Sequence, residues 1–136
     1  MVFALIFGLY LLGPEQRTVA AERTVITIDQ LKTMFAQMRA NADHKKWNVD
    51  GDLLWGYFFT DPDPRKLRSV ADHLTRLGYR FVDIYPTDDE RTFFLHVEKV
   101  EHHTAESLNE RNIAFYRLAE QFHLESYDGM DVGPVE

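Results

Sequence analysis

Cysteine is absent from the 136 residues of this chain. Without cysteine a protein can form no disulfide, no thiolate nucleophile and no cysteine-ligated zinc or iron–sulfur site. A cysteine-free chain fits the cytoplasm, where disulfides are rare. Thiol chemistry is therefore excluded.

Basic residues are few: 15 Lys and Arg stand against 22 Asp and Glu, which gives a net charge of −7. The imbalance belongs to residues 52–136, which carry nine basic and seventeen acidic residues. Nucleic-acid backbones require a basic surface, so we expect no direct nucleic-acid partner. An acidic domain instead attracts basic segments of partner proteins.

Long hydrophobic runs are also missing. A transmembrane helix needs roughly 20 consecutive apolar residues, and no run in this sequence reaches that length. The longest run, MVFALIFGLYLLG, has about a dozen and ends at Gly13-Pro14. It could be a signal peptide with Val19-Ala20-Ala21 as cleavage site, a membrane tether through residues 3–12, a short packed helix, or non-native residues from an upstream start codon. No Lys or Arg precedes it, which argues against export. We expect residues 1–27 to be an apolar N-terminal segment and linker.

The remaining residues, 28–136, are expected to form one domain, since 45% of the chain is apolar. Helical spacing predicts a first helix over 28–42, with Leu31, Met34, Phe35 and Met38 on one stripe, and a polar loop follows over 41–50. A second helix follows Asp63 and Pro64, residues typical of a helix start, and ends before Gly78; a third follows Thr104. Strands are predicted at 52–60, 79–86 and 92–100, with a last one at either 124–127 or 130–132.

This order is one helix followed by β-α-β-β-α-β, which predicts an α+β fold: a ferredoxin-like sandwich with two helices on one face of an antiparallel sheet. In the last strand we expect Gly129 to permit a bend or bulge. Strand alternation sorts the remaining residues into two faces. We expect the helices to cover Leu54, Phe58, Val82, Ile84, Phe93, Leu95 and Val97. The opposite face would then show Trp55, Tyr57, Phe59, Phe81, Asp83, Tyr85, Phe94, His96 and Glu98, with the first helix packed over its aromatic residues.

No residue pattern indicates catalysis, a cofactor or a metal. His96 and Glu98 form H-x-E, but the cysteine half of the zinc deaminase signature is absent. The other histidines have no ligand spacing, and no phosphate-binding loop or nucleophile elbow occurs. Asp61 and Asp63 lie in a predicted turn, where Asp usually caps its own backbone.

Three stretches together resemble a known family: DGDLLWGYFFTDPDP (50–64), LGYRFVDIYP (77–86) and AFYRLAEQFHLESYDGMDVGPVE (114–136). The chain is similar over residues 50–136 to the regulator of ribonuclease E activity B family, also called ribonuclease E inhibitors. The most specific part is Tyr127-Asp128-Gly129 followed by Met130. The resemblance implies a ferredoxin-like sandwich and a non-catalytic role in which the protein binds a bacterial endoribonuclease and reduces its cleavage of messenger RNA. The best-known members carry a long acidic C-terminal extension, and this sequence stops at Glu136.

We therefore expect a cytoplasmic, acidic regulatory protein whose partner is an endoribonuclease or its scaffold region. The candidate binding surface consists of Asp61, Asp63, Tyr127, Asp128, Asp131 and Glu136. A second hypothesis is an interaction or structural domain unrelated to RNA decay, tethered to a membrane or dimerising through the aromatic sheet face. A third, an enzyme using the histidines and carboxylates, has the least support.

Overall fold

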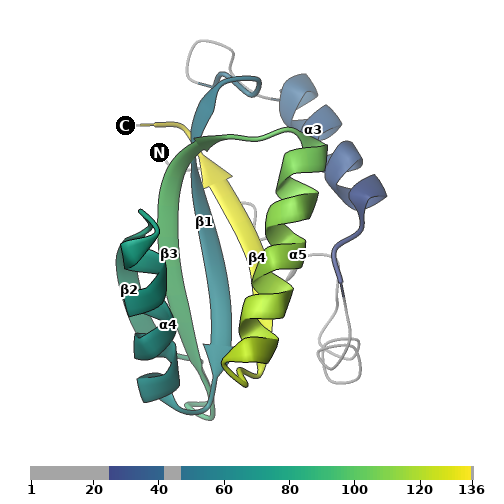
Figure 1. Cartoon of the computed structure of the whole chain (residues 1–136). Helices are drawn as coiled ribbons and strands as arrows, with labels where there is room; N and C mark the ends of the chain where they lie inside the picture. Colours follow the sequence, from purple (N-terminus) through teal and green to yellow (C-terminus); the bar gives the residue numbers. More distant parts are fainter. Residues whose placement is uncertain (1–24, 42–46, 136) are drawn as a thin grey trace.

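The computed structural model of the chain describes residues 25–41 and 47–135 (Figure 1). The described parts contain three helices, α3 (Ile28–Asn41), α4 (Pro64–Arg76) and α5 (Ala105–Gln121), and four strands, β1 (Asp52–Asp61), β2 (Arg80–Pro86), β3 (Phe93–His102) and β4 (Ser126–Gly133). The expected N-terminal segment, most of the linker and Glu136 lie outside the described residues. Within the described ranges, no helix has both the length and the apolar character needed to cross a bilayer.

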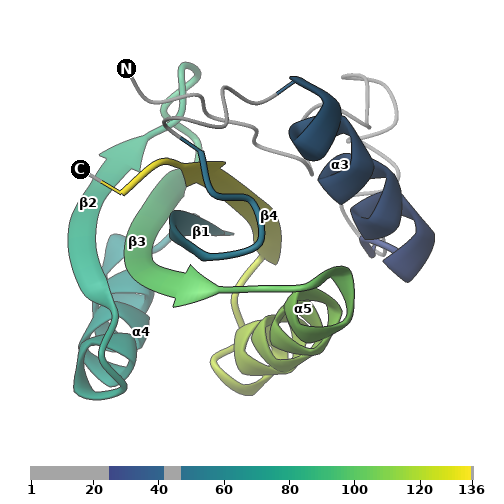
Figure 2. The ribbon, with the colours of Figure 1, turned by 90° about the horizontal axis from the view of Figure 1, so that it is seen from above.

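The four strands form one antiparallel sheet in the order β2-β3-β1-β4. Helices α4 and α5 lie on the same face of this sheet (Figure 2). The predicted α+β fold with a leading helix is confirmed. The last strand, β4, contains residues 126–127 of the first proposed segment and all of the second, 130–132, with a bulge between them, whereas residues 124 and 125 precede the strand.

The helices begin where polar side chains satisfy the free backbone N–H groups of the first turn. Asp63 Oδ1 accepts a hydrogen bond from the Arg65 N–H at 2.9 Å, and Pro64 opens α4. At the start of α5, Thr104 and Ser107 form a reciprocal capping box. Gly78 follows α4 with φ of 96°, a conformation that favours glycine.

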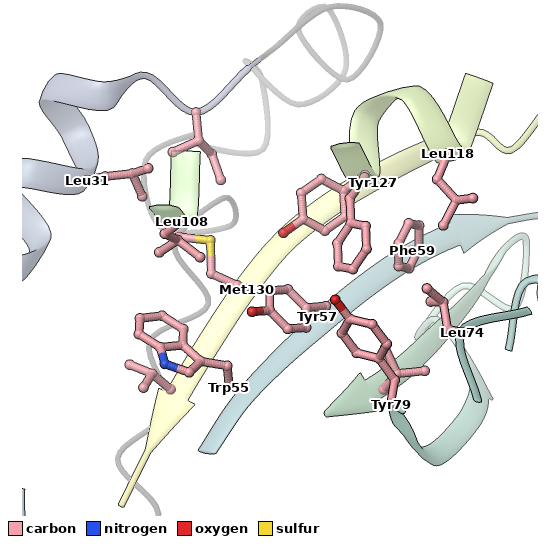
Figure 3. Packing of buried hydrophobic residues seen from close by; sticks show 14 of the residues in the cluster. Leu31, Trp55, Tyr57, Phe59, Leu74, Tyr79, Leu108, Leu118, Tyr127 and Met130 are labelled. Carbon is pink, nitrogen blue, oxygen red and sulfur yellow. The ribbon is translucent and has the colours of Figure 1, made fainter. Parts of the chain in front are cut away.

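The core lies between the sheet and the helices, and strand β1 supplies its largest side chains (Figure 3). Trp55, Tyr57 and Phe59 are buried on this side, where the Phe115 ring of α5 lies 5.0 Å from Tyr57 and 5.3 Å from Phe59. The prediction that these three residues lie on the opposite face is therefore wrong. Leu54 and Phe58 alternate with them and point away from α4 and α5.

In strand β2, Phe81 also lies on the core face of the sheet, opposite to the face predicted for it. Phe81 pairs with Val97 of the core face, and the Arg68 guanidinium of α4 lies 4.4 Å from its ring centroid. Val82 is 39% exposed instead of buried. The pairing of β2 with β3 shifts between Phe81 and Asp83, so simple alternation fails at this point.

Helix α3 does not cover the sheet face opposite α4 and α5. It packs beside α5, and Phe35 lies 5.9 Å from Trp55, ring centroid to ring centroid. Its predicted stripe is buried in the common core with Leu108 and Met130. Hence helix α3 completes the core around Trp55, and none of the described helices covers the other face of the sheet.

Candidate functional site

The candidate site is the sheet face turned away from α4 and α5, here called the open face. Strand pairing places on it residues from all four strands, since residues opposite each other in an antiparallel pair share a face. Its members are Gly56 and Phe58 of β1, Asp83 and Tyr85 of β2, Phe94, His96 and Glu98 of β3, and Asp131 of β4. Five of the nine residues predicted for this face are therefore present.

Aromatic rings form the middle of the open face. The Phe58 ring stacks on the His96 imidazole at a centroid distance of 4.4 Å and meets Phe94 edge-on at 6.4 Å. Tyr85 stacks on Phe94 at 5.5 Å. These contacts hold the rings in fixed orientations at the middle of the open face, where Phe58 is only 3% exposed.

Acidic side chains lie around these aromatic residues. Burial raises the pKa of Tyr85, and the charges of Asp131, Asp83 and Asp128 raise it further. Asp83 belongs to β2 and the other two to β4, the two edge strands of the sheet. Carboxylates from both edge strands therefore raise the pKa of one tyrosine, which shows that acidic groups of β2 and β4 lie near the same part of the open face.

One acid of the open face already has a basic partner within the chain. The Arg80 guanidinium forms an ion pair with the Glu98 carboxylate, whose side chain is 9% exposed. Asp131 has no such partner among the described lysines and arginines. Burial raises the pKa of Asp131 to about 6, and a hydrogen bond that its carboxylate accepts from the Gly56 backbone partly opposes this rise.

Gly56 lies at the centre of this arrangement, between Glu98 on β3 and Asp131 on β4. A Cβ atom at position 56 would lie 2.1 Å from Asp131 Oδ1 and 2.8 Å from His96 Nε2. Side chains from two neighbouring strands therefore occupy the space above this glycine. Any larger residue would displace them.

Comparison with known proteins assigns the family. The family model described as "Regulator of ribonuclease activity B" matches residues 28–132, well over half of the chain. The chain belongs to this family. The resemblance seen in the sequence is thereby confirmed, and the matched region also includes α3. No curated protein matches the chain, and no solved structure matches it.

This family is one of regulators rather than catalysts. Within the described residues, no three His, Asp or Glu side chains are grouped so as to hold a metal ion. The two residues of the H-x-E pattern contact different partners: His96 stacks on Phe58, and Glu98 forms an ion pair with Arg80.

The predicted binding residues of this regulator-family protein do not gather in one place. Asp61 and Asp63 lie where β1 enters α4, and their oxygens bind local backbone groups. Asp61 accepts hydrogen bonds from the N–H groups of Asp63 at 2.9 Å and Glu125 at 3.0 Å, and its carboxylate lies 3.3 Å from Lys66 Nζ. Asp61 is buried, so most of its hydrogen-bonding capacity is used inside the fold.

Residues 127–131 are divided between the two sides of the sheet. Tyr127 is buried, and its hydroxyl donates a 2.6 Å hydrogen bond to Asn112 Oδ1 of α5. Asp128 occupies the bulge, where the pairing of β4 with β1 shifts, and Gly129 has φ of 105°. Asp131 lies on the open face. The expected bulge is present beside Gly129, at Asp128. Gly56 and Phe58, which lie near Asp131 on the open face, were not among the predicted binding residues.

A second polar cluster lies inside the molecule and was not predicted. The Glu101 carboxylate accepts hydrogen bonds from the Tyr57 hydroxyl at 2.7 Å and from Arg111 Nη1 at 2.7 Å, and it lies 3.3 Å from His103 Nε2. Burial alone would raise the pKa of Glu101, but hydrogen bonds from His103, Arg111 and Tyr57 lower it to about 2. Because its members are separated by up to 54 positions in the chain, sequence spacing carries no signal of this cluster.

Proposed function

We propose that this protein regulates an endoribonuclease of the ribonuclease E type by binding a basic segment of that enzyme or of its scaffold region. Occupation of this segment reduces or modulates RNA cleavage, and the protein acts without catalysis, in the cytoplasm. The observation that supports the proposal most directly is the open face. It combines acidic groups with rigid aromatic rings in a chain that belongs to a family of ribonuclease regulators.

The physical basis is complementary charge. RNA-processing enzymes carry basic segments, and a negative surface attracts them and increases the rate of encounter. The net charge of −7 acts in the same direction. RNA itself is repelled by the same acids, so the protein competes for the basic segment without binding the substrate.

A titration of the purified protein onto the basic segment of the ribonuclease tests this proposal. Raising the ionic strength from about 0.01 M to about 0.15 M shortens the screening length from roughly 30 Å to 8 Å. We expect the affinity to fall about tenfold over this range. Binding that is absent at low salt, or insensitive to salt, contradicts the proposal.

A cleavage assay with matched variants then connects binding to regulation. We propose Asp131 and Asp128 as contributors to the interface, and Asp131→Asn and Asp128→Asn each remove one acidic group. Asp72→Asn is the matched control, because Asp72 is exposed on α4, away from the open face. We expect wild-type protein and the Asp72 variant to slow RNA cleavage, and the Asp131 and Asp128 variants to slow it less. Asp61, Asp63, Tyr127 and Glu136 stay predictions for this interface.

A further inference from the structure

The open face is the side of the sheet that no described helix covers (Figure 2). An antiparallel sheet with one face in water places polar side chains on that face, in alternation with its buried residues. The two central strands depart from this rule. Strand pairing adds Leu54 and Val100, which lie opposite each other, to Phe58 and Phe94 on the open face. Strands that are apolar on both faces are typical of a sheet that is covered on both sides.

Several apolar side chains of the open face remain accessible among the described residues. Val100 is 49% exposed, and Val82, in the irregular part of β2, is 39% exposed. Leu54, Tyr85 and Phe94 are half-buried. Removal of apolar surface from water is the dominant favourable term in folding. An apolar segment that lies across these residues is therefore stabilised there.

The chain itself contains such a segment. Residues 3–12, FALIFGLYLL, have no charged side chain and are about half as long as a membrane-spanning helix. They lie outside the described residues. Residues 13–24 connect them to Val25, and at about 3.3 Å per residue this connection spans up to about 40 Å. Strand β1 has ten residues and is about 33 Å long, so the connection can reach any part of the open face.

The described part of the chain begins close to one edge of the sheet. Ile26 donates its backbone N–H to the Tyr116 hydroxyl of α5 at 3.0 Å. The Tyr116 ring lies 5.1 Å from the ring of Tyr127, centroid to centroid, and Tyr127 belongs to the edge strand β4. A chain that leads away from Val25 therefore has to pass only this edge strand to reach the open face.

We propose that residues 3–12 pack on the open face over Leu54, Val82 and Val100 and form its covering layer. The segment then occupies the surface to which the basic segment of the ribonuclease is proposed to bind, so the two compete. In this respect the inference rests on the proposed function and adds a means of regulation, because binding requires displacement of the protein's own N-terminal segment. The packing itself does not depend on the ribonuclease.

Single cysteines can measure this packing in the full chain, because the protein contains no cysteine of its own. Val100→Cys reports on the open face, and Ile113→Cys, at a position of α5 that is 40% exposed, reports on a surface outside it. Each is combined with Leu9→Asp, which places a charge in the apolar segment, or with the matched control Thr18→Asp in the connection. We expect Leu9→Asp to raise the rate of maleimide labelling at Val100→Cys about tenfold, while Thr18→Asp leaves it unchanged. Ile113→Cys should be labelled at one rate throughout.

Comparison at one cysteine removes the influence of neighbouring charges on thiol reactivity. An unchanged rate at Val100→Cys in the Leu9→Asp protein overturns the inference. Dilution gives a second criterion, since a segment of the same chain protects the cysteine equally at every protein concentration. A labelling rate that rises on dilution assigns the protection to a second copy and also overturns the inference.

The basic segment of the ribonuclease separates this inference from the proposed function. We expect it to bind the Leu9→Asp protein about tenfold more tightly than the Thr18→Asp protein. If Val100→Cys is protected but the basic segment binds neither protein, the proposed function is wrong and the packing stands. If the basic segment binds both proteins equally and Leu9→Asp does not change the labelling, the packing is wrong and the proposed function stands. Protection of Val100→Cys together with equal binding overturns the competition.

Discussion

Asp131 is a largely buried carboxyl group of the open face, and its ionisation opposes folding. Its carboxylate is buried enough on the open face to raise its pKa, and no described lysine or arginine neutralises it. A group kept charged in such surroundings reduces the stability of the folded state.

Replacement of Asp131 by Asn is expected to stabilise the free protein at high pH. The folded pKa, about 6, lies above the ordinary value of 3.8, so the stabilising effect of this carboxyl is complete below pH 3.8 and is lost as the pH rises through 6. At pH 8 we expect Asp131→Asn to increase the free energy of unfolding by about 1 to 2 kcal/mol, after allowance for partial exposure. Urea denaturation measures this difference.

The same comparison at pH 4 is the control, because the wild-type carboxyl is then protonated in the folded state. The difference between the two proteins should shrink toward zero. Asp72→Asn removes the same charge from an exposed site on α4 and is expected to change stability little at either pH. A destabilised Asp131→Asn protein at pH 8 would show that the carboxylate has a stabilising contact.

At the scale of the elements, Asp61 connects three of them. It ends β1, accepts a hydrogen bond from the residue that caps α4, and accepts another from Glu125 just before β4. The two aspartates on either side of Pro62 therefore have different structural roles. Asp61 connects the end of β1 to the starts of α4 and β4, and Asp63 caps helix α4. The Asp-Pro repeat is explained by folding at both positions.

Asp61→Ala is expected to lower the free energy of unfolding by about 2 to 3 kcal/mol, because two backbone N–H groups lose their acceptor. Chemical denaturation measures the loss. Asp88→Ala, in the exposed turn between β2 and β3, is the matched control and should cost far less. Equal effects of the two substitutions would contradict the role assigned to Asp61.

Elements and their order were predictable from the sequence, whereas one strand face was not. The ends of helices α4 and α5 are predictable from local residues: Asp63-Pro64 and Gly78 for α4, and Thr104 for the start of α5. Strand β1 reads LLWGYFF, with apolar residues at both alternations, so periodicity cannot decide which set is buried. Gly56 is the informative exception, since a glycine among large side chains indicates a close approach from neighbouring strands.

At the scale of the whole molecule, the buried cluster around Glu101 joins the sheet to helix α5. This carboxylate joins Tyr57 of β1, His103 at the end of β3 and Arg111 of α5. The Arg111 guanidinium also lies 5.4 to 5.7 Å from the ring centroids of Tyr57, Tyr79 and Phe115. One acid therefore connects the sheet to the helix that covers it.

We expect this cluster to make the protein sensitive to acid. The folded pKa of Glu101, about 2, lies below its ordinary value of 4.5, so its stabilising effect is present above pH 4.5 and is lost as the pH falls toward 2. The wild-type protein should lose about 2 kcal/mol more than Glu101→Gln over this range. Unfolding free energies at pH 5 and pH 2.5 provide the measurement. Glu110→Gln, on the exposed side of α5, should follow the wild-type curve.

The bulge at Asp128 has a consequence for how this family can vary. One extra residue in β4 allows Tyr127 and Met130, three positions apart, to face the same side, where strict alternation would separate them. Loss of Asp128 alone would leave Tyr127 and Met130 two positions apart, so regular alternation would keep both in the core and Asp131 on the open face. Loss of two residues would instead turn Met130 outward and Asp131 into the core, so sequence alignments of relatives should contain at most a one-residue gap between positions 127 and 131.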